Sequence, residues 1–180
     1  MQQIVCSRSF SKRVESLDEL RESVASYTVR AAEKLGAEQQ VCKMLSVSLR
    51  TDLFNPTEPI YSYSAVPPLA TPTNDSNQLI NVATRLLRAI WRPGYRYAKA
   101  GVMLSELSRQ GQGLAGLFST PEEARREQLM QTIDQINERQ HGRVFIAAQG
   151  IQQEWSMKRR YLSPGYTTRW NEIPLAWTLR

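Results

Sequence analysis

The chain has 180 residues, of which 41% are hydrophobic and 22% charged, a composition typical of a soluble globular protein with one sizeable domain or two small ones. No apolar run approaches the roughly 18 residues of a membrane span, and no secretory signal precedes the first strand-like segment, so we expect a cytoplasmic protein. The net charge of +6 is compatible with a polyanionic partner such as nucleic acid but does not establish one.

Hydrophobic periodicity predicts six elements in the first 108 residues. Ser16 and Glu19 form a capping box at the start of the first helix, and Asp75 caps a second helix that ends at Pro93-Gly94. The predicted elements are strands over residues 3–10, 41–51, 60–66 and 95–104, with helices over residues 17–35 and between Asp75 and Pro93.

The resulting order, β-α-β-β-α-β, predicts an α+β domain. Its expected form is a four-stranded, mostly antiparallel sheet with two helices on one face and the other face open, the ferredoxin-like arrangement. In the second strand, alternation assigns Val41, Leu45, Val47 and Leu49 to the core and Cys42, Met44, Ser46, Ser48 and Arg50 to the open face.

The chain divides at a Gly- and Gln-rich stretch. We expect a binding domain over residues 1–108, a linker over residues 109–121 and a small helix-containing region over residues 122–180. Thr120-Pro121 favours a helix start, and Leu129, Ile133 and Ile136 provide an apolar stripe. Residues 143–148 have the pattern of a short strand.

No residue set predicts catalysis or a cofactor. Asp18, Glu19 and Glu22 occupy the first turns of a helix, where acids complement the helix dipole, and they do not form the converging carboxylates of a two-metal site. Cys6 and Cys42 lack the neighbours that a zinc site requires. The sequence therefore predicts a binding module rather than an enzyme.

Basic and small hydroxyl side chains suggest a DNA-binding surface on the open sheet face, because such residues can approach a phosphate backbone closely. An ordinary solvated sheet face is an equal alternative. Arg85, Arg88 and Arg92, with Arg96 beyond them, form a second basic set, which we interpret as a solvated helix face. The candidate DNA-binding residues are Ser7, Arg8, Ser9, Lys12, Arg13, Ser46, Ser48, Arg50, Tyr97, Lys99 and Gly101.

The last 30 residues mix aromatic and basic side chains. Such a mixture suits base stacking on single-stranded nucleic acid, or protein docking, which we favour since Trp, Tyr and Arg dominate interface hot spots. The candidate docking residues are Trp155, Lys158, Arg159, Arg160, Tyr166, Arg169 and Trp170.

Several blocks of the chain resemble the UmuC/MucB/ImpB family, the catalytic subunits of bacterial DNA polymerase V, which are Y-family translesion polymerases. The similar blocks are residues 31–35 (AAEKL), 69–76 (LATPTNDS), 90–97 (IWRPGYRY), 100–104 (AGVML), 150–159 (GIQQEWSMKR) and 163–170 (SPGYTTRW). At Gly165 the family has Arg, and the role of that turn is therefore open.

The resemblance implies that residues 1–108 are the little finger domain, which lies along primer–template DNA, followed by the C-terminal extension of UmuC proteins. The catalytic palm, with its magnesium ions, would lie upstream of this fragment, which would itself be no enzyme. The implied setting is SOS mutagenesis and DNA repair, and the implied partners are the cleaved UmuD dimer, the RecA filament and the β sliding clamp.

The clamp would bind the linker. The family's clamp-binding peptide has a Gln followed by Leu-x-Leu-Phe, and the matching residues here are Leu114, Leu117 and Phe118. The aligned Gln is missing, although Gln112 lies two positions earlier, so we expect a weak site.

Two other functions compete with a DNA-binding domain. One is an adaptor that docks clamp or UmuD-type partners without binding DNA on its own. The other is an RNA-binding sheet of the RRM type, which is less favoured because the candidate strands lack the exposed aromatic platform on central strands that such domains use.

Overall fold

A computed structural model describes residues 2–110, 121–138, 144–151 and 153–157. The first part contains β1 (Ile4–Val14), α1 (Leu17–Ala37), β2 (Gln40–Thr51), β3 (Ser62–Ala65), β4 (Pro68–Thr73), α2 (Ser76–Ile90) and β5 (Tyr97–Arg109). Beyond it are α3 (Pro121–Glu138) and the short 3₁₀ turn η2 (Ala147–Gln149). The predicted α+β fold is confirmed, with one strand more than expected.

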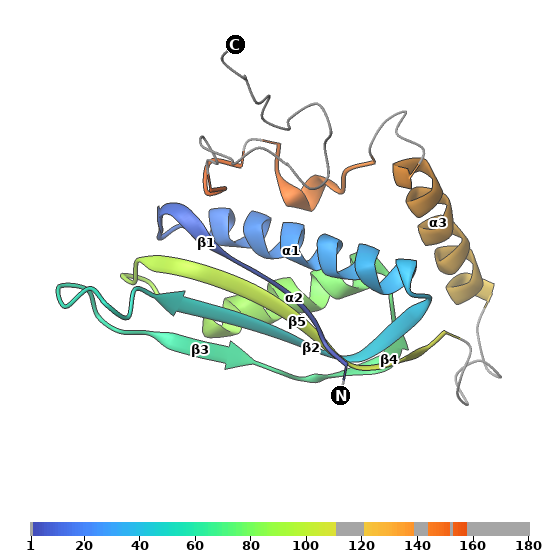
Figure 1. The fold of residues 1–180 in the computed structure, drawn as a ribbon, viewed down its shortest axis with the longest axis horizontal. Helices are drawn as coiled ribbons and strands as arrows, with labels where there is room; N and C mark the ends of the chain where they lie inside the picture. Colours follow the sequence, from blue (N-terminus) through green and yellow to red (C-terminus); the bar gives the residue numbers. More distant parts are fainter. Residues whose placement is uncertain (1, 111–120, 139–143, 152, 158–180) are drawn as a thin grey trace, which may run out of the picture.

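The strands form one sheet in the order β1-β5-β2-β3, and every pairing is antiparallel. β4 follows β3 along the same edge of β2, so the two short strands share one position in the sheet. β5, the last strand in the described part of the chain, lies between β1 and β2 (Figure 1). The two strands that each helix connects are therefore not neighbours in the sheet. β5 lies between β1 and β2, which α1 connects, and β2 lies between β4 and β5, which α2 connects.

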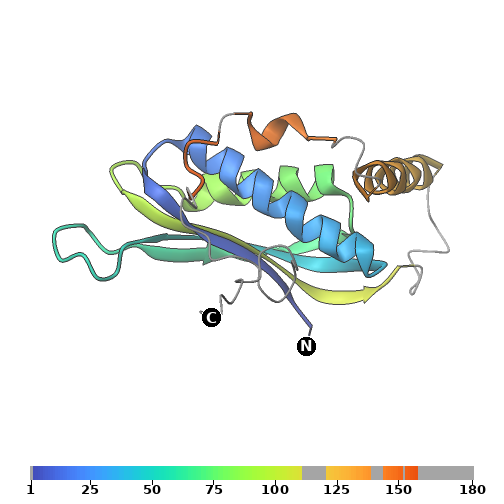
Figure 2. The ribbon, with the colours of Figure 1, turned by 45° about the horizontal axis from the view of Figure 1, so that its top comes forward.

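α1 and α2 cover one face of the sheet, and residues 144–151 and 153–157 lie on the outer side of α1 (Figure 2). The helices begin as predicted, because the side chains of Ser16 and Asp75 accept hydrogen bonds from backbone N–H groups of the first turn. Glu19 instead forms an ion pair with Lys12, 3.2 Å away.

The core lies between the sheet and the two helices. Residues at helical spacing on α1 and α2 pack against alternate residues of β2 and β5, which is the pattern of a sheet with one buried face. The fully buried members include Leu20, Val24 and Leu35 of α1, Leu79 and Leu87 of α2, Leu45, Val47 and Leu49 of β2, and Val102 and Leu104 of β5.

Four local predictions were wrong. Cys42, not Val41, lies in the core, where the pairing of β2 with β4 is irregular between Cys42 and Met44. Residues 68–73 form β4 despite two prolines, and residues 143–148 contain no strand in their described part. On α3, Met130 is buried, whereas Leu129 and Ile136 are exposed.

Candidate nucleic-acid interface

The sheet face opposite α1 and α2 presents two parallel rows of polar side chains. We call it the open face and define it by these rows. Strand register places Ser7, Gly101, Ser48 and Ser64 side by side in one row, and Ser9, Lys99, Arg50 and Ser62 in the next. Neighbouring strands are about 4.8 Å apart, so each row crosses the sheet as a continuous line. These eight positions include two cations and no acid.

Gly101 brings the first row close together. A Cβ atom at this position would lie 2.7 Å from the Cβ of Ser7 and 3.1 Å from the Oγ of Ser48. The Ser48 hydroxyl donates a hydrogen bond to the Gly101 carbonyl oxygen, 3.3 Å away. Only glycine fits between the two serines, and Gly101 is itself buried at the centre of the open face.

Lys99 and Arg50 face each other across β5 and β2 in the second row. Within the described part of the chain, no ion pair joins either residue to an acid. Both cations remain available for an external anion, and phosphate groups are the natural ligands for such a pair.

The prediction that Tyr97 faces the open side was wrong. The register between β2 and β5 shifts at Arg50/Thr51, so that Tyr97 pairs with Thr51 and turns into the core. Its hydroxyl accepts a hydrogen bond from the Arg92 N–H at 2.8 Å and donates one to the Arg92 carbonyl oxygen at 3.1 Å. Burial raises the pKa of this phenol.

Ser46 and Arg8 are also poor contact candidates. Ser46 occupies the open side of β2 but is buried. Arg8 lies on the side of β1 that faces the helices, as do Ile4 and Cys6, which pack against the core. Its positive charge acts to lower the pKa of Tyr27 on α1, although burial outweighs this effect. Alternation along β1 leaves Ser7 and Ser9, rather than Arg8, on the open face.

Lys12 and Arg13 belong to β1 and hold neighbouring segments. Lys12 contacts Glu19 at 3.2 Å and Glu154 at 3.1 Å, and hydrogen bonds to these two carboxylates raise its pKa. Arg13 forms ion pairs with Asp52 and with Glu58. These cations are already neutralised, which is a structural role that the sequence pattern did not indicate.

Ser62 and Ser64 of β3 complete both rows, and sequence reasoning missed them. Both are exposed and pair with Arg50 and Ser48 of β2. Alternation in Ser62-Tyr63-Ser64-Ala65 could have found them, because it places the two hydroxyls on one face of the strand.

Neither a metal site nor a membrane span is present in the parts of the chain that the structure describes. No group of three or more His, Cys, Asp or Glu side chains could hold a metal ion there. None of the helices in those parts is long and apolar enough to cross a bilayer.

Family comparison assigns the chain. Residues 1–117 match the model of the impB/mucB/samB family C-terminal domain. This chain belongs to the impB/mucB/samB family. The resemblance that the sequence blocks indicated is thereby confirmed. A second match, to a domain of unknown function (DUF4113), covers residues 127–176.

Several proteins of this family are similar over nearly the whole chain. The chain is 46% identical to protein ImpB of Salmonella typhimurium over 176 residues, covering 97% of this chain and 42% of ImpB. It is 45% identical to protein UmuC of Salmonella typhimurium (strain LT2) and 43% identical to protein MucB of Escherichia coli, covering 96% and 97% of this chain and 41% of each relative. The chain thus spans about two fifths of these relatives' length.

Two solved structures are more distantly similar. One is described as the insertion ternary complex of Dbh DNA polymerase, with a TM-score of 0.47 and 11% identity over 61% of this chain and 29% of that chain. The other is described as a complex of the beta-clamp processivity factor and the little finger domain of PolIV, with a TM-score of 0.43 and 15% identity over 61% and 92%.

The predicted docking residues of this impB/mucB/samB family member lie mostly outside the described residues. This applies to Leu114, Leu117, Phe118, Lys158, Arg159, Arg160, Tyr166, Arg169 and Trp170. Trp155 is described and contradicts its predicted role. It is 3% exposed and makes edge-to-face contacts with Phe10 and Tyr27, with ring centroids 6.4 and 5.7 Å away. It is a core residue, not a docking residue.

Proposed function

We propose that this chain is the non-catalytic, DNA-binding part of an error-prone translesion DNA polymerase, and that its open face binds the backbone of primer–template DNA. The observation that carries the proposal is the pair of rows on that face. They combine five serine hydroxyls with two cations that form no ion pair within the described part of the chain, and they contain no acid. Membership of the impB/mucB/samB family supports this assignment.

Phosphate binding explains the composition of the rows. Lys99 and Arg50 would replace counterions along the DNA backbone, and the small serine side chains would let the sheet approach closely. Contacts to phosphate groups position a protein on DNA without reading its bases. We therefore propose binding without sequence preference, as a polymerase that moves along its template requires.

Catalysis would lie elsewhere in the polymerase. The chain spans about 42% of ImpB, and we propose that the magnesium-dependent transfer reaction belongs to the part of the relatives that this chain does not match. The cleaved UmuD dimer, the RecA filament and the β sliding clamp remain proposed partners, with Leu117 and Phe118 as the proposed clamp contacts. A cytoplasmic location is part of the same proposal.

A salt titration tests the DNA contact. The affinity of the 180-residue chain for a labelled primer–template duplex should fall with salt, and the double variant R50E/K99E should bind more weakly. Because each phosphate contact contributes about −0.9 to the slope of log K against log salt, the variant's slope should be shallower by roughly 2.

Arg125→Glu is the matched control, since it reverses an exposed charge on α3 without touching the open face. It should leave both the affinity and the slope nearly unchanged. If R50E/K99E has the native circular dichroism spectrum and binds duplex like the native chain, the open face is not the DNA contact.

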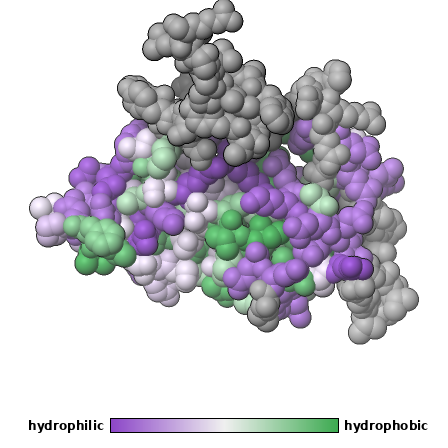
Figure 3. Space-filling view, in the orientation of Figure 1, coloured by the Kyte–Doolittle hydropathy of each residue, from purple (hydrophilic) through white to green (hydrophobic). Residues whose placement is uncertain are grey.

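A second candidate function is a protein-docking adaptor, and the β2–β3 connection favours it. Phe54 in this connection is 93% exposed, and Leu53 and Ile60 of the same connection are also exposed. Figure 3 shows this region as a green patch at the left-hand end. Phe54 N–H donates to Asp52 Oδ1, and Arg13 pairs with Asp52, so the loop is held in place.

The same titration separates the two functions. An adaptor would show no salt-sensitive duplex binding even at low ionic strength. In that case purified sliding clamp and UmuD dimer become the partners to measure, with Phe54→Ser as the variant that should weaken docking.

A further inference from the structure

The outer face of α2 carries a stripe of exposed polar residues. Asn77, Asn81, Arg85 and Arg88 follow one another at helical spacing, and Arg92 continues the line just beyond the helix end. The opposite helix face, with Leu79 and Leu87, is buried in the core. α2 itself contains no acidic residue.

These arginines are not neutralised within the described part of the chain. No ion pair there joins Arg85, Arg88 or Arg92 to an acid. The acids near this end of α2 are already engaged, because Arg96 binds Glu15 at 3.3 Å and Glu58 at 3.0 Å. Helix-dipole complementarity accounts for Arg88 in the last turn, but not for the other two.

A cluster of tyrosines continues the stripe at the C-terminal end of α2. The Tyr61 hydroxyl donates a hydrogen bond to the carbonyl oxygen of Ile90, the last residue of the helix. The ring of Tyr61 lies 4.9 Å from that of Tyr95 and 6.5 Å from that of Tyr63, centroid to centroid.

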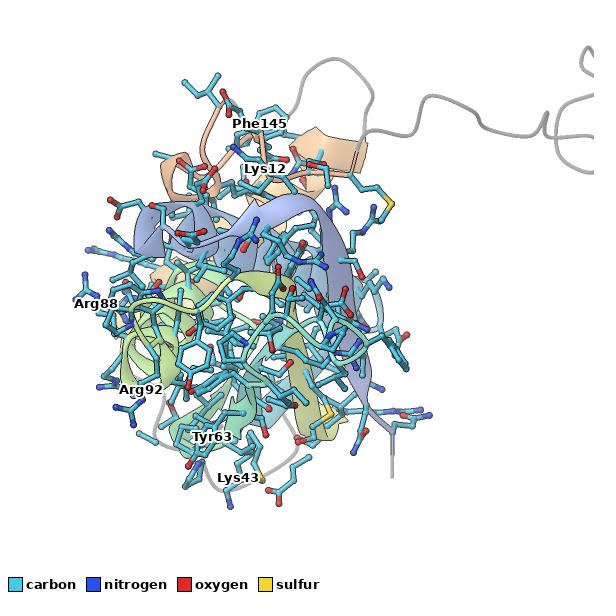
Figure 4. All side chains as sticks on the ribbon, turned by 90° about the vertical axis from the view of Figure 1, so that its left-hand side faces the viewer. Lys12, Lys43, Tyr63, Arg88, Arg92 and Phe145 are labelled. Atoms are coloured by element: carbon cyan, nitrogen blue, oxygen red, sulfur yellow. The ribbon has the colours of Figure 1, made fainter. Side chains whose placement is uncertain are left out.

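Tyr63 is the exposed end of this cluster. It pairs with Leu49 across β2 and β3, so it belongs to the helical side of the sheet, and it is 60% exposed. Figure 4 shows Arg88, Arg92 and Tyr63 on one side of the molecule, in that order toward the sheet edge. The arginines and an exposed, supported aromatic ring thus lie on the same side of the molecule.

This combination matches single-stranded nucleic acid. Arginines track the phosphates of a strand, and an aromatic ring stacks on a base whose face is free, which a duplex does not offer. Tyr and Arg are also common in protein interfaces, so an acidic protein surface is the alternative that the test has to separate from single-stranded DNA. We propose that Arg85, Arg88, Arg92 and Tyr63 form a second nucleic-acid site, for single-stranded DNA, on the side of the sheet opposite the open face.

Binding of labelled oligothymidylate to the 180-residue chain tests this site. R88E/R92E should weaken binding and make the salt slope shallower by about 0.7 per lost phosphate contact on a single strand. Tyr63→Ala should weaken binding about 5- to 150-fold, the range for loss of one stacked base, whereas Tyr63→Phe should bind like the native chain. Arg125→Glu, a single charge reversal on α3, is the control and should leave binding nearly unchanged.

The two proposed sites are distinguished by crossing the variants with the two DNA forms. R88E/R92E should leave duplex binding by the open face unchanged, and R50E/K99E should leave oligothymidylate binding unchanged. The proposal is overturned if the native chain does not bind oligothymidylate, or if both double variants weaken both DNA forms alike. It is also overturned if the arginine variant loses binding but Tyr63→Ala does not, since the surface would then recognise charge alone, as for an acidic protein partner.

Discussion

At position 101 a glycine lies between serines of two neighbouring strands. Its missing side chain lets β1 and β2 bring Ser7 and Ser48 together over β5. Glycine in a strand interior costs about 0.5–1 kcal/mol relative to alanine, so its presence here reflects the close approach of the serines rather than strand propensity.

Gly101→Ala should therefore destabilise the protein although alanine is intrinsically better in a strand. The added Cβ would lie 2.7 Å from the Cβ of Ser7, and overpacking of this kind costs about 1–3 kcal/mol. Urea unfolding measures the change. The double variant Ser7→Gly/Gly101→Ala removes the blocking atom and should recover most of the loss. Equal stability of the single and double variants would show that the contact does not govern this site.

At the scale of elements, residues 144–157 behave as part of the first domain. Ile146 packs on Ala25, Val29 and Ile80, which belong to α1 and α2. The Trp155 indole N–H donates to the Glu22 carboxylate at 3.4 Å, and the Trp155 carbonyl oxygen accepts from the Ser11 N–H at 3.2 Å. This segment covers the helices and ties the chain back to β1.

Trp155→Ala should lose about 3–5 kcal/mol of unfolding free energy, the usual cost of removing a buried large aromatic side chain. Ile151→Ala, in the same segment but fully exposed, should change stability little. Both are measured by urea unfolding with tryptophan-independent detection. A loss below about 1 kcal/mol for Trp155→Ala would mean that the segment detaches before the domain unfolds.

The sequence predicted helices better than strand faces. Both helices and their N-terminal caps were predicted, because apolar spacing and capping residues are local signals. β4 was missed because prolines at positions 68 and 72 suggest a loop, yet prolines are tolerated on the sheet edge that β4 occupies.

The candidate site was predicted where alternation holds and missed where it breaks. Ser48, Arg50 and Lys99 follow strict alternation and lie on the open face. Between Lys99 and Tyr97 the pairing of β5 with β2 shifts by one residue, which a single sequence does not reveal. Such a shift exchanges the two faces of the strand, so Tyr97 points into the core. Trp155 was misassigned because an aromatic residue in a basic tail has the same local pattern whether it packs inward or binds a partner.

At the scale of the whole molecule, burial holds three groups, Tyr27, Cys42 and Tyr97, in their neutral forms. Burial raises the pKa of Tyr27 from 10.0 to about 12 and that of the Cys42 thiol from 9.0 to about 12. Tyr97 is raised in the same direction and for the same reason. In the unfolded chain these groups would ionise at their ordinary pKa values.

Stability should therefore fall at alkaline pH. The pKa values of these groups are higher in the folded protein than in the unfolded chain. Their contribution to the free energy of unfolding is therefore complete below about pH 9 and is lost as the pH rises from 9.0 toward about 12. Tyr27→Phe keeps the ring and removes one ionising group, so its stability should fall less steeply across this window. Urea midpoints at a series of pH values measure both slopes, and identical slopes would exclude Tyr27 as a source.

The position of β5 at the centre of the sheet also determines when the protein can fold during synthesis. β1 ends at Val14, but its partner β5 ends at Arg109, 95 residues later. At about 5–20 residues per second, the ribosome needs roughly 5 to 20 s to supply that partner. For this interval β1 and one edge of β2 have no strand to pair with, and the apolar face of α1 has no complete sheet beneath it. We expect the nascent chain to be a chaperone client until the last strand has emerged.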